Sequence, residues 1–180
     1  MTPSENLQNA IAEHQAMFAK LGNLIPQISL VAEELKACLK RGGKILLMGN
    51  GGSAADSQHI AAEIVGRFKK ERRGLAAIAL TTDTSIITSV GNDYGYDYIF
   101  ARQVEALCRP EDVVIGITTS GNSKNVVAAI AEANKLGATT IGLTGGTGGK
   151  LTELCKFNLI MPSSETARVQ EAHIFVGHSL

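Results

Sequence analysis

Aromatic residues are scarce in this chain: it has no tryptophan, and tyrosine and phenylalanine make up 4% of its 180 residues. This scarcity argues against a stacking surface for single-stranded nucleic acid. No apolar run is long enough to span a membrane, and the N-terminal residues do not resemble a signal peptide. Basic and acidic residues balance at 17 each, so no general positive field attracts nucleic acid or an anionic membrane. We therefore expect a cytoplasmic protein with no nucleic-acid or membrane partner.

Cysteine is also sparse. Cys38, Cys108 and Cys155 are odd in number, far apart and in no paired pattern. Reduced thiols explain such cysteines most simply.

Short apolar runs alternate with helical patterns along most of the chain. The runs are residues 45–48, 76–80, 113–118, 139–144 and 157–161, and each is nearly continuous in apolar residues. This pattern indicates a doubly wound α/β fold, a five-stranded parallel sheet with helices on both faces. Residues 1–40 have helical spacing and are interrupted by Pro26, which predicts two N-terminal helices. We expect one domain over residues 1–180, with an α/β core in 41–180 and N-terminal helices that contribute to oligomerisation.

The first strand leads into a glycine-rich turn, Asn50-Gly51-Gly52-Ser53. The glycines allow positive φ and close approach to the backbone, and Ser53 is placed to cap the following helix. A strand, a glycine turn and a helix N-terminus together form a good anion site. His59 and Glu63 are four residues apart on that helix, so we expect them on one face and near the anion site.

A second polar turn, Thr118-Thr119-Ser120-Gly121-Asn122-Ser123, follows the third strand. Its hydroxyls and amides suit a phosphate, although the same residues populate ordinary turns. Neither turn has the Walker lysine or the spacing G-x-G-x-x-G, which disfavours nucleotide hydrolysis and dinucleotide binding. Because ligands of parallel α/β sheets bind beyond the carboxyl ends of the strands, the glycine-rich turns should meet there. Residues 91–95 are expected to form a loop.

Three of the four histidines fall in two helical stretches. His59 accompanies Glu63, and the last helix carries Gln170, His173 and His178. Imidazole, carboxylate and amide oxygen make a reasonable set of zinc ligands. Gln170 and His178 are about 12 Å apart along a helix axis, so His173 remains an alternative to His178 on the spacing alone.

Several motifs, in order, resemble the sugar isomerase (SIS) domain family and, within it, the phosphoheptose isomerases. They are GNGGSAADSQHIAAEIVGRF, TTDTS, VGNDYGYD, ITTSGNS, LTGGTGG and ARVQEAHIFVGH, and the resemblance extends from the N-terminal helices to the last residue. It implies conversion of sedoheptulose 7-phosphate to D-glycero-D-manno-heptose 7-phosphate through an enediol, the first step towards activated heptose for surface glycans. It also implies a homotetramer with active sites at subunit interfaces.

The resemblance assigns roles by position. It implies one zinc ion per subunit, held by His59, Glu63, Gln170 and His178, with Glu63 and His178 as the acid/base pair. Sugar-phosphate contacts would come from a wider set of residues: Asn50, Gly51, Gly52, Ser53, Glu63, Asn92, Asp93, Thr118, Thr119, Ser120, Ser123 and Gln170.

The resemblance has two departures. Some members of the family have an acid where this chain has Ala167, and we expect the last helix to continue past Leu180. Two alternatives are a non-catalytic SIS module that binds the replication initiator and a SIS isomerase for another sugar phosphate. The first lacks counterparts of both Glu63 and His178, which this chain has. The set His59, Glu63, Gln170 and His178, with the stretch VGNDYGYD, disfavours the second.

Overall fold

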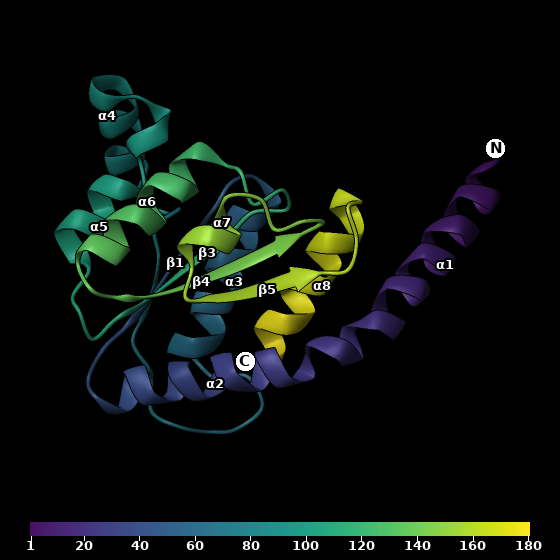
Figure 1. The fold of residues 1–180 in the computed structure, drawn as a ribbon, viewed down its shortest axis with the longest axis horizontal. Coiled ribbons are helices and arrows are strands. Elements are labelled where there is room, and N and C mark those ends of the chain that lie inside the picture. Colours follow the sequence, from purple (N-terminus) through teal and green to yellow (C-terminus); the bar gives the residue numbers. More distant parts are fainter.

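The computed structural model describes all 180 residues, and alternating strands and helices dominate it (Figure 1). The N-terminal part comprises α1 (Pro3–Leu21), a 3₁₀ turn η1 (Gly22–Leu24) and α2 (Ile25–Lys40). The core then follows in chain order: β1 (Ile45–Gly49), α3 (Gly52–Val65), β2 (Ala77–Ala79), α4 (Thr84–Tyr94), η2 (Tyr96–Tyr98), α5 (Ala101–Leu107), β3 (Val113–Ile117), α6 (Lys124–Lys135), β4 (Thr139–Gly145), α7 (Leu151–Leu154), β5 (Phe157–Met161) and α8 (Thr166–Ser179). None of these helices is long and apolar enough to cross a membrane.

The five strands form one parallel sheet in the order β2-β1-β3-β4-β5, which confirms the predicted fold class. In the β1–β3 pair, Ile45 lies opposite Val113 and Gly49 opposite Ile117. The strand order reverses direction between β1 and β3, because β2 lies outside β1 on one side and β4 follows β3 on the other. Sheets of this kind bind ligands at the carboxyl ends of the strands beside that reversal.

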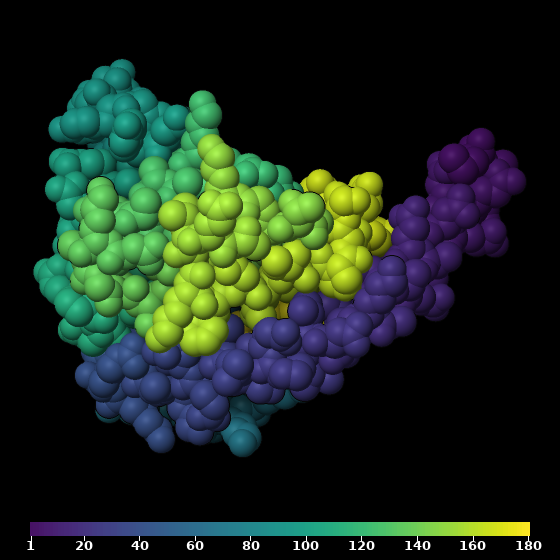
Figure 2. All heavy atoms as spheres, in the orientation of Figure 1, coloured from purple at the N-terminus to yellow at the C-terminus, as the bar shows by residue number.

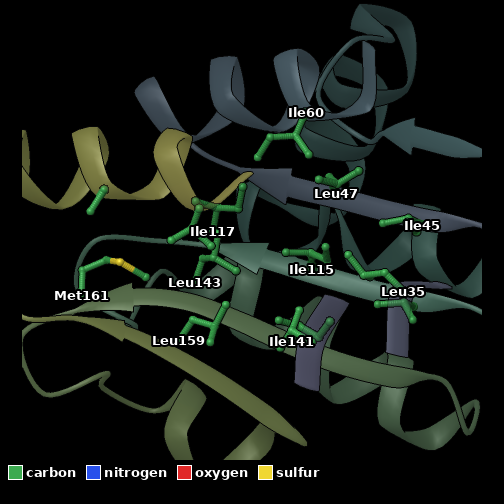
Figure 3. Close-up of a cluster of buried hydrophobic side chains, with 14 of the residues drawn as sticks. Leu35, Ile45, Leu47, Ile60, Ile115, Ile117, Ile141, Leu143, Leu159 and Met161 are labelled. Carbon is green, nitrogen blue, oxygen red and sulfur yellow. The ribbon is translucent and has the colours of Figure 1, made fainter. Parts of the chain in front are cut away.

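Side chains from both faces of the sheet are buried in two apolar clusters. One lies between the sheet and the helices α2, α3 and α8, and includes Leu35, Leu47, Ile60 and Ile117 (Figure 3). The other lies on the opposite face under α5, α6 and α7 and includes Phe100 and Ile130. Both faces of the central strands β1, β3 and β4 are therefore buried, which explains why these strands appear in the sequence as nearly continuous apolar runs.

The first helix extends away from the body of the protein as an arm (Figures 1 and 2). Two of its apolar side chains are left in solvent, Leu7 at 63% and Ile11 at 49% exposure. Its second half is attached to α8: His14 Nδ1 lies 2.7 Å from Glu171 Oε2, and Arg168 donates to the Ala10 carbonyl at 2.7 Å. These polar contacts and the buried side chains of Met17 and Leu21 hold the base of the arm, while Leu7 and Ile11 nearer its tip stay exposed.

Three local predictions need correction. The two N-terminal helices are separated at η1, and Pro26 lies in the first turn of α2, where its missing N–H leaves no carbonyl unpaired. Gly51, at φ 53°, is the N-cap of α3, whereas Ser53 is buried inside the first turn and makes no capping bond. Residues 91–94 belong to α4, because the Asp83 cap, which accepts from Ile86 N at 2.9 Å, starts a helix that ends only at Gly95.

Candidate active site at the carboxyl ends of β1 and β3

Two polar turns lie at the point where the strand order reverses. The turn after β1 contains Asn50 and Gly51, and the turn after β3 extends from Thr118 to Ser123. Each leads into a helix, and the first amide groups of a helix have no intrahelical partner. Thr118 Oγ1 and Ser123 Oγ are 2.9 Å apart and close the second turn across its base. The turns thus place hydroxyls and helix N-termini at this edge of the sheet, and their binding of an anion stays a prediction.

The turn after β4 joins this group, as the sequence also predicted. Gly145 N donates to the Thr119 carbonyl at 3.1 Å, and Leu151 N donates to the Gly121 carbonyl at 3.3 Å. Gly121 has a φ of 70°, and a Cβ there would overlap the Gly148 carbonyl. Glycine is therefore required where these two turns touch.

A pair of asparagine side chains joins the turn after β1 to the first turn of α6, which directly follows the turn after β3. Asn50 Nδ2 donates to Asn125 Oδ1 at 2.9 Å, and Asn125 Nδ2 donates to Asn50 Oδ1 at 2.8 Å. The Tyr96 hydroxyl also donates to Asn50 Oδ1, at 2.9 Å. The sequence singled out neither Asn125 nor Tyr96. Their only signal is that each lies within a few residues of a predicted ligand-binding stretch.

The predicted substrate contacts Asn92 and Asp93 lie in the last turn of α4. Asn92 Nδ2 donates to Asp93 Oδ1 at 2.8 Å, and both side chains are exposed. Tyr96, three residues after Asp93, connects this segment to Asn50. The segment therefore lies beside the first turn, although neither residue itself contacts it.

A second polar group lies further along α3, where α8 packs against it. His59 Nε2 is 3.3 Å from Glu63 Oε1 and 3.0 Å from His178 Nε2, and all three ligand atoms lie within 4.8 Å of one another. His59 and Glu63 share a face of α3, as their spacing predicted. The spacing alone left His173 and His178 open as the third member, and His178 is the one that lies in this group.

His173 has a different environment. It is fully buried and makes a 3.2 Å hydrogen bond to the Thr144 carbonyl, with its Nδ1 left without a partner. Burial lowers the pKa of its imidazole to about 4, against the small opposing effect of that hydrogen bond. We conclude that His173 is a neutral core residue.

Gln170 is not part of the His59, Glu63 and His178 group in this chain. A Cβ on Gly52 would lie 2.5 Å from Gln170 Nε2, so the Gln170 amide packs on the first turn of α3. Gly177 packs on Ile60 in the same way, so α3 and α8 run parallel. His59 is seven residues beyond Gly52, about 10 Å along the helix. The two polar groups therefore occupy different ends of the α3–α8 pair, further apart than the sequence suggested.

Two residues near the second group were also missed. Phe68 stacks on the His178 ring with centroids 4.9 Å apart and planes 6° from parallel. Asp56 lies one turn before His59, and its Oδ2 is buried without a hydrogen-bond partner. Burial raises the pKa of the Asp56 carboxyl, while nearby His59 opposes the shift. Asp56 is thus a partly buried carboxyl beside His59 whose Oδ2 has no hydrogen-bond partner.

Glu63 and His178 also border a cavity of about 660 Å³ between α2, α3 and the end of α8. Leu35, Ile64 and Leu75 are among its mostly apolar lining residues. Five of the other lining residues are basic: Lys36, Lys40, Lys69, Lys70 and Arg72. The cavity thus combines apolar and basic residues, whereas the turns offer hydroxyls and helix N-termini to a phosphate.

The residues present suit a divalent metal such as zinc. Two imidazole nitrogens and one carboxylate converge on a small volume, and the two Nε2 atoms face each other at 3.0 Å. Two neutral imidazoles can share one proton at that distance, and a cation between them would satisfy both lone pairs. Nitrogen and oxygen donors in this combination are usual for zinc.

The fold and these turns define a sugar-phosphate-binding α/β protein of the SIS class. The family model of the SIS domain matches residues 10–145. More distant solved structures agree with that fold, such as the sugar isomerase domain of an RpiR transcription factor from Sphaerobacter thermophilus, at 18% identity and a TM-score of 0.66.

Closer relatives identify the family within this class. The chain is 64% identical to the phosphoheptose isomerase of Aquifex aeolicus, over 86% of this chain and 81% of that one. It is 55% identical to that of Geotalea daltonii, over 98% and 92%. The phosphoheptose isomerase structure from Neisseria gonorrhoeae superposes with a TM-score of 0.94 at 44% identity, covering 99% of this chain and 96% of that one. The chain belongs to the phosphoheptose isomerase family.

Proposed function

We propose that this protein converts sedoheptulose 7-phosphate to D-glycero-D-manno-heptose 7-phosphate, an aldose–ketose isomerisation through an enediol. The observation that carries the proposal is the convergence of His59, Glu63 and His178 in a chain that also has two polar turns, each leading into a helix N-terminus. The high identity to phosphoheptose isomerases over most of the chain supports this substrate. This reaction is the first step towards activated heptose for surface glycans.

The reaction moves one proton between neighbouring carbons. A base must remove it from the carbon next to the carbonyl, and an acid must protonate the oxygen and later be regenerated. We assign the base to Glu63 and the acid to His178. Phe68 stacks on the His178 ring and limits its rotation, which keeps Nε2 directed at the group. We assign the substrate's phosphate and hydroxyls to residues in and around the two turns. They are Gly51, Gly52 and Ser53 after β1, Thr118, Thr119, Ser120 and Ser123 after β3, and Asn92, Asp93 and Gln170 from α4 and α8.

We further propose one zinc ion per subunit, held by His59, Glu63, His178 and Gln170. When bound, zinc supplies a Lewis acid that polarises the substrate carbonyl. A Glu63 that binds zinc is a weaker base, so the two duties of this carboxylate compete.

The position of Gln170 favours an active site shared between subunits. It is about 12 Å from His178 along α8, and it packs on Gly52 in this chain. A second copy of the chain is therefore the source we propose for the fourth ligand, in a homotetramer. The exposed apolar side chains on the arm, Leu7 and Ile11, are the surface we expect the copies to cover.

A non-catalytic role as a binding module for the replication initiator is the weaker alternative. Such a module needs the fold and the turns but has no use for an acid and a base. The convergence of Glu63 with His178 and His59 favours the enzyme.

The test is turnover of sedoheptulose 7-phosphate by the purified protein, after chelation and again after zinc is added. Activity that disappears on chelation and returns with zinc supports the isomerase and its metal. Activity that survives chelation refutes the role of zinc and leaves the isomerase. A folded oligomer without activity in any condition refutes the proposed enzyme.

A mixing experiment tests the shared site. Gln170→Ala and His178→Ala proteins should each be inactive. Unfolding and refolding them together should restore part of the activity, because some sites then combine the intact residues of two subunits. No restoration in mixed oligomers, detected by two affinity tags, would show that each chain supplies its own site.

A further inference from the structure

Asn50 has little capacity left for a substrate, although the sequence places it among the substrate contacts. Its Oδ1 accepts from Asn125 Nδ2 at 2.8 Å and from the Tyr96 hydroxyl at 2.9 Å. An amide oxygen has two lone pairs, so both are used. Its Nδ2 donates to Asn125 Oδ1 at 2.9 Å, which leaves one N–H free. The side chain is thus committed mainly to the protein.

Asn125 is the more constrained partner. Its side chain is buried, at 2% exposure, in the first turn of α6. Its Oδ1 accepts from Asn50 Nδ2 and also from Val126 N, at 2.9 Å. A buried amide with these partners has one orientation, because a flip would set donor against donor and acceptor against acceptor.

The pair also has a particular place in the fold. Asn50 follows β1 and Asn125 follows β3, the two strands between which the strand order reverses. It is a direct side-chain bridge between the first polar turn and the start of α6, the helix that follows the second polar turn, and it joins residues 75 positions apart in sequence. The distance between the turns must match the substrate if both are to bind it at once.

We propose that Asn125 is a positioning residue for the isomerase: through the reciprocal amide pair with Asn50 it sets the separation and orientation of the two substrate-binding turns. Tyr96 is the third member, and its hydroxyl connects the segment that carries Asn92 and Asp93 to the same pair. Asn50 therefore acts by holding the turn. This inference rests on the proposed function, because its consequence for rate is measured on that reaction.

Two substitutions of Asn125 test the pair. Asn125→Asp has nearly the same shape but sets a carboxylate oxygen against Asn50 Oδ1, and Asn125→Leu removes every hydrogen bond. A displacement of about 1 Å between reacting groups can cost 10²-fold in rate, so we expect kcat/KM to fall about 100-fold in each. Tyr96→Phe, which loses one hydrogen bond, should lower it about tenfold.

Asn134→Ala is the matched control. Asn134 lies near the other end of α6 and makes comparable hydrogen bonds, donating to the Leu154 carbonyl at 2.8 Å and accepting from Thr140 Oγ1 at 2.9 Å. The Asn134→Ala substitution should lower the melting temperature and leave kcat/KM within about twofold of the parent. All variants are assayed at a temperature where circular dichroism shows them fully folded.

Two further measurements separate positioning from stability alone. Asn50→Leu, Asn125→Leu and the double variant should lose similar factors in kcat/KM, because residues that act as a unit are not additive. In a Glu63→Gln background, which removes the proposed base, calorimetry with sedoheptulose 7-phosphate should show weaker binding when Asn125 is changed.

The outcomes distinguish the two proposals. Full kcat/KM in folded Asn125 variants, or losses that multiply in the double variant, would overturn the positioning role. Binding that depends on Asn125 in a parent without turnover would support the pair and refute the proposed reaction. A parent that neither binds nor converts the sugar phosphate would overturn both.

Discussion

The buried His173 should make the stability of the protein depend strongly on pH. Its imidazole is fully buried and its pKa falls from the ordinary 6.5 to about 4, mainly because burial disfavours the charged form. The unfolded chain therefore binds a proton below pH 6.5 that the folded chain excludes. The stabilising contribution is present above pH 6.5 and is lost as the pH falls towards 4.

The magnitude follows from the two pKa values. Linkage gives a loss of about 2 kcal/mol in the free energy of unfolding between pH 7 and pH 5, and about 3 kcal/mol by pH 4. His173→Gln cannot titrate and can still donate to the Thr144 carbonyl. The parent's free energy of unfolding falls between pH 7 and pH 5, and we expect His173→Gln to make that fall about 2 kcal/mol smaller. This difference does not depend on how far the substitution changes the stability at pH 7.

Urea unfolding at pH 7, 6 and 5, at one protein concentration, measures this difference. Val176→Ala is the control, because Val176 is buried on the same helix and cannot titrate. It should lower the free energy of unfolding by a similar amount at every pH. Equal losses between pH 7 and pH 5 in the parent and in His173→Gln would refute the reasoning.

Two other predictions concern the site. Glu63→Gln and His178→Ala should each lower kcat by at least about 10²-fold, the usual contribution of a general acid or base. The oligomer mass in light scattering should stay unchanged. Loss of the oligomer would instead show that these residues are structural. Gly121→Ala should lower the melting temperature by about 4 °C or more and raise KM, because the new Cβ would force the β3 and β4 turns apart. Gly22→Ala, where a Cβ meets nothing within 4 Å and φ is −53°, should be nearly neutral, and equal effects of the two substitutions would contradict this account.

The sequence alone determined the order of strands and helices along the chain and the fold class. The three central strands are buried on both faces and therefore appear as apolar runs, and each strand begins or ends near glycine or proline. The pairing of His59 with Glu63 was predictable for a similar reason, since it depends only on the helical repeat. Local signals were weaker at element ends: Ser53 resembled a cap, but Gly51 alone tolerates the backbone conformation that the turn requires.

The tertiary structure decided which distant side chains meet. His173 and His178 are both on α8 and equally plausible from the sequence. The packing of α8 places the first against β4, where it is buried, and brings the second to His59 on α3. The same packing places Gln170 on Gly52 and separates the two polar groups of the site. Asn125 and Tyr96 become partners of Asn50 only through the strand order. Spacing within one helix is a local property, whereas contacts between elements depend on how their apolar faces are buried together.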